Sequence, residues 1–89
     1  MTTEIHAAEN LGVRMISIEV NDHRVAMPAR PATGLEIKNV AIEQGVNIQP
    51  NFVLQVQLPN GSSKVIGNDD QVRLTEHLAF TAIAADDNS

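Results

Sequence analysis

The 89-residue chain contains no cysteine, no tryptophan and no tyrosine, and only two phenylalanines. Without cysteine it cannot build a disulfide framework, a thiolate zinc site or a cysteine-ligated iron–sulfur cluster. A cysteine nucleophile is excluded as well. The lack of cysteine also fits a reducing compartment.

Long apolar runs are also missing. No stretch approaches the roughly 18 apolar residues that a membrane-spanning helix needs. Residues 1–10 have neither the basic start nor the apolar stretch of a secretory signal. Together these absences predict a cytoplasmic protein.

Positive charge is scarce. Six Lys and Arg stand against eleven Asp and Glu, so the formal net charge is −5 at pH 7. Binding to nucleic acid needs cations for the phosphates and often aromatic rings for the bases, and anionic membranes attract basic segments. We therefore expect neither nucleic acid nor a membrane among the partners.

No pattern for catalysis or metal binding is visible. The histidines His6, His23 and His77 lack a second ligand at metal-binding spacing, and Asp69 and Asp70 lack the rest of a calcium loop. The serines have no partner base, and no glycine-rich phosphate loop is present. We predict that the chain is not an enzyme and holds no metal or cofactor.

What is present is enough for one small core, since hydrophobic residues make up 43% of the chain. Apolar and polar residues alternate over 16–20, which predicts a strand with one apolar face. The polar residues 21–23 predict a turn, and 24–27 predict a returning strand that Pro28 ends. The chain therefore begins its fold with a hairpin.

Residues 33–45 carry the clearest helix pattern. Thr33 and Glu36 have the spacing of a capping box, and Gly45 supplies a left-handed stop. One face of this helix holds Ile37, Val40, Ala41 and Gln44.

Three more strands are predicted after the helix, at 52–58, 64–66 and 78–83, and 72–74 predicts a short bridge or a single helical turn. Alternation turns a set of apolar side chains inward: Phe52, Leu54, Val56, Leu58, Leu78, Phe80 and Ala82.

The element order is strand, strand, helix, strand, strand, strand. One helix must cover one face of a mixed sheet, and the last strand is expected to lie beside the first in parallel. This predicts an α+β fold of the β-grasp type, with a mixed four- to five-stranded sheet packed on one helix. We expect the domain over residues 15–84, a flexible arm over 1–14 and a flexible acidic tail over 85–89.

The outward face of the predicted sheet offers a candidate docking patch. If Leu54 and Phe80 point inward, Val53 and Ile83 point outward among polar neighbours. Exposed aliphatic side chains can mark a binding surface, although single exposed apolar residues are common in all proteins.

Several short motifs occur in the order found in a known family. They are Ile16–Asn21 in the first strand, Thr33–Ile37 at the helix start, Gly45 after the helix, and Val72–Leu74 followed by Phe80. With them, the run from Met15 to about Ile83 resembles bacterial ubiquitin-like proteins of the multiubiquitin type. These are β-grasp domains encoded beside enzymes like those that activate and transfer ubiquitin. The resemblance implies a protein modifier whose C-terminal carboxylate is activated by an E1-like adenylating enzyme and passed by an E2-like transferase to protein targets.

The last residues depart from that pattern. Ubiquitin and the sulfur carriers finish in Gly-Gly, whereas this sequence finishes in Asp86, Asp87, Asn88 and Ser89. The missing diglycine argues against sulfur carriage, but some bacterial ubiquitin-like modifiers also lack it. We predict that Asp86, Asp87 and Asn88 carry recognition and linkage after a partner peptidase removes Ser89. A frayed acidic end explains the same residues without any function.

The only lysines are Lys38 and Lys64, so we expect single attachment, or chains through Met1 or Lys64. Two other functions fit the same residues. A non-covalent ubiquitin-like adaptor has this fold with an inert tail, and an acidic inhibitor of the antitoxin type masks a basic partner. Salt should weaken the binding of such an inhibitor steeply.

Overall fold

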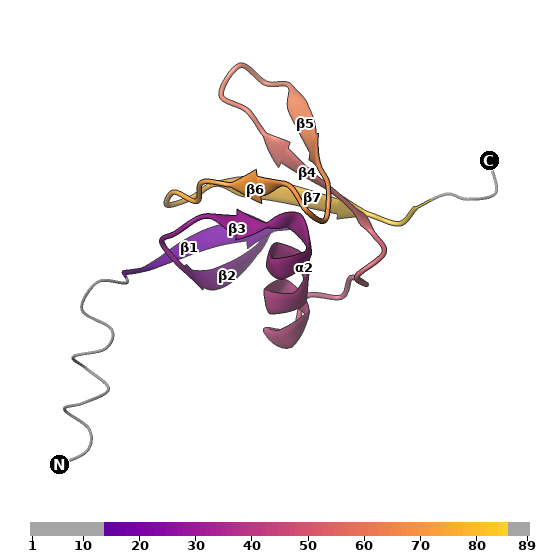
Figure 1. Cartoon of the computed structure of the whole chain (residues 1–89), viewed down its shortest axis with the longest axis horizontal. Coiled ribbons are helices and arrows are strands. Elements are labelled where there is room, and N and C mark those ends of the chain that lie inside the picture. Colours follow the sequence, from indigo (N-terminus) through magenta and orange to yellow (C-terminus); the bar gives the residue numbers. More distant parts are fainter. Residues whose placement is uncertain (1–13, 86–89) are drawn as a thin grey trace, which may run out of the picture.

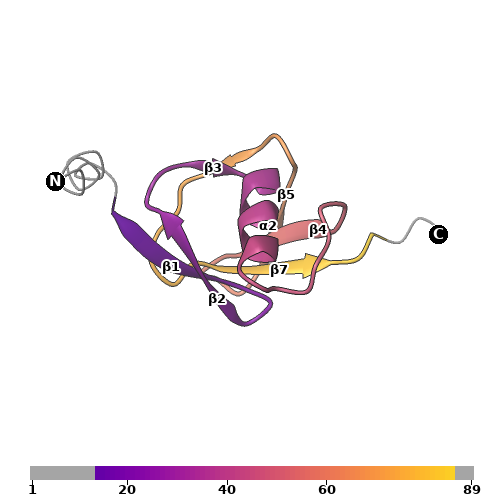
Figure 2. The ribbon, with the colours of Figure 1, turned by 90° about the horizontal axis from the view of Figure 1, so that it is seen from below.

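The computed structural model describes residues 14–85, which form one helix on one face of a five-stranded sheet (Figures 1 and 2). The helix is α2 (Gly34–Glu43), and the sheet consists of β1 (Met15–Val20), β2 (His23–Pro28), β4 (Val53–Gln57), β5 (Ser63–Ile66) and β7 (Ala79–Ile83). Two short strands, β3 (Ala32–Thr33) and β6 (Gln71–Val72), pair with each other in a separate small sheet. The predicted arm over 1–14 and tail over 85–89 lie outside the described residues, apart from Arg14 and Ala85.

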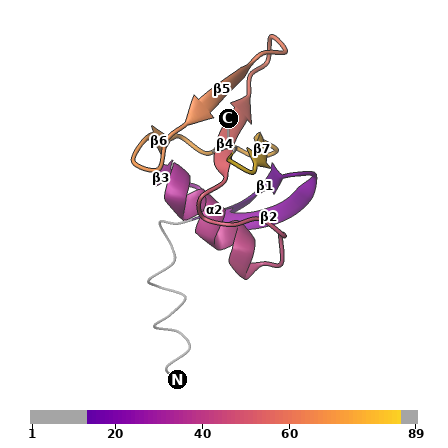
Figure 3. The ribbon, with the colours of Figure 1, turned by 90° about the vertical axis from the view of Figure 1, so that its right-hand side faces the viewer.

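The strand order in the main sheet is β2-β1-β7-β4-β5, as Figure 3 shows with the sheet seen from its end. The strands β1 and β7 are parallel, and the other neighbours are antiparallel. The last strand of the chain therefore lies in the middle of the sheet, directly beside the first. This arrangement confirms the predicted mixed sheet of the β-grasp type.

The first hairpin turns at two of the three predicted residues, since His23 already belongs to β2. Asn21 and Asp22 both have positive φ angles, 53° and 69°, as in the two-residue turns that match the twist of antiparallel strands. Pro28 does not lie beyond the ladder, as we expected, but is the last residue of β2 and is the Cα partner of Met15. A proline fits there because β2 is an edge strand and the missing N–H faces away from β1.

The start of α2 is held by its capping box and by a neighbouring loop. The Glu36 N–H donates to Thr33 Oγ1 at 3.2 Å, and the Thr33 N–H donates to Glu36 Oε1 at 2.8 Å. The next two free amides of the helix, those of Gly34 and Leu35, donate to carbonyls of loop residues 68–70. Gly34 is buried here, and only glycine fits because a Cβ atom at this position would collide with the carbonyl of Gly67.

The core lies between α2 and the inner face of the sheet, and its most completely buried large side chains are Ile18, Val20, Val25, Ile37 and Leu54. The alternation predicted for β1, β4 and β7 is confirmed at Ile18, Val20, Leu54 and Phe80. The expectation for Leu58 is wrong. Its side chain is exposed, because it follows the end of β4 at the base of the turn into β5. Of the segment 72–74, only Val72 belongs to the short strand β6, and no helical turn forms there.

Gly34→Ala tests how closely the helix start and the loop after β5 approach each other. We expect this variant to lower the free energy of unfolding by about 1–3 kcal/mol, because the added methyl group must displace backbone. Urea unfolding followed by circular dichroism measures the change. The control is Asn39→Ala at an exposed site of the same helix, which should change stability by less than about 0.5 kcal/mol. Equal stability of the two variants would contradict the close approach.

Candidate functional site

Three aliphatic side chains lie together on the outer face of the sheet, away from α2. Val53 on β4 and Ile83 on β7 are direct cross-strand partners, and 37% and 48% of their surfaces are exposed. Val65 on β5 is 57% exposed and is the partner of Gln55, which places it diagonally next to Val53 on the same face. We call Val53, Val65 and Ile83 the outer apolar patch.

The outer apolar patch lies on the uncharged half of the outer face. The other outward residues of β4, β5 and β7 are polar or small, namely Gln55, Gln57, Ser63, Ala79 and Thr81. Charged residues on this face belong to the other half, where Glu19 pairs with Arg24 across β1 and β2. A partner that covers the patch therefore does not need to desolvate a charge.

Val53 and Ile83 are thus exposed side by side, as the alternation led us to expect, while their docking role stays a prediction. Val65 was missed. The sequence predicted a strand over 64–66 but did not show which face of it is inward; the burial of Ile66 turns its neighbour Val65 outward.

The outer apolar patch is continuous with the segment that leads to the tail. Ile83 is the last residue of β7, and the exposed Ala84 and Ala85 follow it. The predicted linkage residues Asp86, Asp87, Asn88 and Ser89 lie outside the described residues, so their role also stays a prediction.

The two lysines have opposite surroundings. Lys38 is only 3% exposed, and its ammonium donates to the carbonyls of Pro50 and Phe52, both at 2.7 Å. Burial lowers the pKa of Lys38 below its ordinary value of 10.5. Lys64 is exposed on the edge strand β5. Lys38 therefore anchors the loop before β4, and Lys64 is the accessible one of the two lysines.

The side chains that resemble ligands do not converge. His23 begins β2 and His77 lies in a turn, and both are exposed, while His6 lies outside the described residues. Asp70 Oδ2 accepts from the Gly67 N–H at 2.8 Å, which is ordinary turn chemistry. Within residues 14–85, no three His, Cys, Asp or Glu side chains are grouped so that they could hold a metal ion. No helix in this part of the chain is long and apolar enough to cross a membrane.

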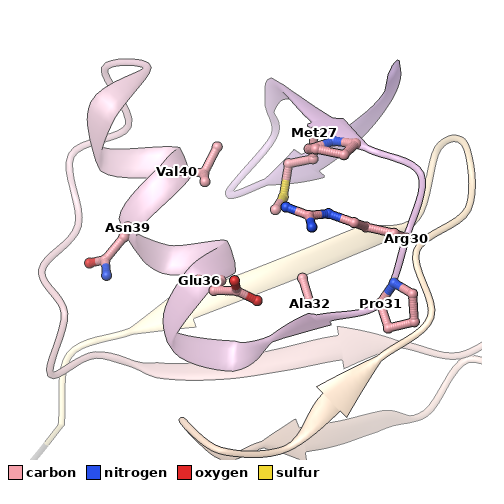
Figure 4. Close-up of a pocket in the computed structure, with 8 residues that line it drawn as sticks. Met27, Arg30, Pro31, Ala32, Glu36, Asn39 and Val40 are labelled. Atoms are coloured by element: carbon pink, nitrogen blue, oxygen red, sulfur yellow. The ribbon is translucent and has the colours of Figure 1, made fainter. Parts of the chain in front are cut away.

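A pocket of about 170 Å³ opens between the end of β2, β3 and α2 (Figure 4). Apolar side chains, including Met27 and Val40, line it together with Arg30 and Glu36. Glu36 Oε1 accepts a hydrogen bond from the Thr33 N–H in the helix cap, and among the described residues no second carboxylate lines the pocket. Its size suits a single side chain rather than a substrate or cofactor.

Lys38→Met tests the anchoring role of the buried lysine. The thioether side chain keeps the apolar stem but leaves two carbonyls without their donor, so we expect a loss of about 1–3 kcal/mol in the free energy of unfolding. The matched control Lys64→Met removes an exposed ammonium and should change stability by less than about 0.5 kcal/mol. Thermal or urea unfolding of both variants measures the change. If Lys38→Met left the free energy of unfolding unchanged, water would be able to replace the ammonium at no cost.

Comparison with known proteins places this architecture in a family. The sequence model of the multiubiquitin family matches residues 16–86, which is most of the chain and includes the whole sheet except Met15. No curated protein and no solved structure matches the chain significantly. Domains of this family are ubiquitin-like, typically non-catalytic, and work through protein partners, which agrees with the prediction that the chain is not an enzyme. The chain therefore belongs to the multiubiquitin family and folds as a ubiquitin-like domain.

Proposed function

We propose that this chain is a protein modifier that an E1-like adenylating enzyme and an E2-like transferase attach to target proteins in the cytoplasm. The observation that carries the proposal is the match to the multiubiquitin family over residues 16–86. The ubiquitin-like body supplies recognition, and the segment after β7 supplies the carboxyl group that is joined to the target.

The position of β7 supports this role. It is the central strand, held on one side by β1 and on the other by β4, so the segment that follows it starts from a rigid point. Ala84 and Ala85 are small and exposed, which suits entry into a narrow enzyme channel. An enzyme that covers the outer apolar patch contacts Ile83 and lies next to the start of the tail.

The linkage we propose runs through Asn88. Hydrolysis of the peptide bond between Asn88 and Ser89 by a peptidase releases serine and leaves a carboxylate on Asn88. That carboxylate displaces pyrophosphate from ATP to form an acyl adenylate, and an enzyme thiol then displaces AMP. An amine of the target attacks the resulting thioester, forms an amide and returns the thiol.

The surroundings of the lysines bear on chain formation. Lys38 is buried and engaged by two carbonyls, so it is a poor acceptor for a second copy. Lys64 is exposed, so chains through a lysine are expected to use Lys64.

Deletion of residues 86–89 tests the proposal. In cells that also express the partner enzymes, the full chain should form higher-mass adducts and the deletion variant none, while both remain folded. Intact-mass measurement of the adducts should show the loss of Ser89. Adducts joined through Ser89 would disprove the trimming step. A full chain that binds partners but never forms an adduct is an adaptor, and one whose binding vanishes in moderate salt is an acidic inhibitor.

The outer apolar patch is tested by Val53→Ser combined with Ile83→Ser. The loss of two docking contacts should slow transfer roughly thirtyfold without unfolding the domain, since each buried aliphatic group contributes on the order of 1 kcal/mol and the two together about 2 kcal/mol. Met15→Ser is the matched control, because Met15 is an exposed apolar residue on β1 in the same sheet. Transfer rates are compared by gel after a single round of thioester discharge. Equal rates for both variants would remove the outer apolar patch from the docking surface.

A further inference from the structure

The two edge strands of the main sheet, β2 and β5, differ in whether their outward backbone groups are already hydrogen-bonded. An edge strand exposes backbone N–H and C=O groups that can pair with another strand, and proteins usually cover or interrupt them. The contrast between the two edges is therefore informative about partners.

The β2 edge is closed by a side chain. Val20 and His23 flank the two-residue turn, so they exchange backbone hydrogen bonds with each other. Along an antiparallel ladder such hydrogen-bonded pairs alternate with pairs that form no hydrogen bonds between them. The backbone groups of Arg24, Ala26 and Pro28 therefore point to the free edge. The Gln44 carboxamide takes both groups of Ala26, accepting from its N–H at 2.9 Å and donating to its C=O at 2.8 Å. Pro28 has no N–H to offer. Few backbone groups of β2 therefore remain free to pair with an added strand.

A second carboxamide closes the gap beyond the end of β1. Asn21 Oδ1 accepts from the Ala82 N–H at 2.8 Å, and Asn21 Nδ2 donates to the Ala82 C=O at 3.1 Å. The side chain of Asn21 thus takes the place of the next residue of a strand beside β7.

The β5 edge has no such cover. The Leu58 N–H donates to the Ser62 C=O at 2.8 Å, and the register pairs Val56 with Lys64. Bonded pairs alternate, so the N–H and C=O groups of Ser63 and Val65 point away from β4 to the free edge. In the described part of the chain, no side chain bonds to them, and both residues are exposed.

We propose that the β5 edge is a binding site for an extended segment of a partner protein, which adds to the sheet as a sixth strand. An antiparallel segment centred on Lys64 forms four backbone hydrogen bonds with Ser63 and Val65. This site is separate from the carboxyl tail, so it does not depend on the proposed conjugation.

The charge of Lys64 selects the partner. The residue opposite Lys64 lies on the same face as its ammonium, which favours aspartate or glutamate there. The residues before and after it lie on the other face, where one of them is opposite Val65 and extends the outer apolar patch by one strand. The segment that fits therefore alternates apolar and acidic residues.

A second copy of this chain fits poorly. In the register with four hydrogen bonds, Lys64 stands directly opposite Lys64 of the other copy, and like charges repel there. Centring the pair on Val65 avoids this repulsion but leaves only two bonds, because the N–H and C=O of Gly67 are already bound by Asp70.

The test uses the full chain labelled with nitrogen-15 and a short blocked peptide in which valine and glutamate alternate. In a nuclear magnetic resonance titration, the amide signals of Ser63 and Val65 should shift, and their hydrogen exchange should slow. A peptide that alternates valine and lysine should bind about fivefold more weakly, and Lys64→Glu should reverse this preference. Arg24→Glu changes a charge on the other edge and should leave both affinities unchanged.

Val65→Pro removes one edge donor at a position where an edge strand tolerates proline, and it should reduce binding below detection. If Val65→Pro fails to fold, the Lys64→Glu reversal still decides the question. Binding at the β2 edge, a preference that Lys64→Glu does not alter, or a folded Val65→Pro variant that binds normally would each overturn the proposal. So would a dimer of the wild-type chain that Val65→Pro disrupts.

Discussion

The parallel contact between β1 and β7 holds the two halves of the domain together. The register joins only two residue pairs, Glu19 with Ala79 and Val20 with Phe80. Backbone bonds from Glu19 to Leu78 and from Asn21 to Phe80 complete it, at 2.9 and 3.0 Å. Val20 and Phe80 are both buried where the two strands meet, so the core shields this contact from water. Because α2 connects the first hairpin with the later strands, the packing of α2 on the sheet also depends on the contact between β1 and β7.

The sheet of this ubiquitin-like domain has one face taken by the core and one face open to solvent. Its inner face is consumed by the core against α2, and polar side chains near the core serve structure. Lys38 anchors the loop before β4, and Glu36 caps the helix. What remains for partners is the outer face and the edges of the sheet.

The β2 side and the β5 side of the sheet differ both in the charge of the outer face and in the state of the edge. The β2 side carries charge and has its edge filled by Gln44, whereas the β5 side carries the outer apolar patch and an open edge. The segment toward the tail leaves from Ile83 within that patch. This division fits the proposal that partners bind to the β5 half of the sheet.

Local patterns in the sequence determined most of the elements. Alternation predicts β1, β4 and β7, and the spacing of Thr33 and Glu36 predicts the helix start, because these signals depend only on neighbouring residues. The exposure of Val53 and Ile83 follows from the same alternation. Tertiary structure alone decided that Lys38 is buried, that Gln44 covers the β2 edge, that Asn21 bonds to the central strand β7, that β3 pairs with β6 and that Leu58 is exposed. Each of these depends on a backbone group that a distant part of the chain brings near, or on where the core stops covering a strand. The spacing of neighbouring residues in the sequence does not encode either of them.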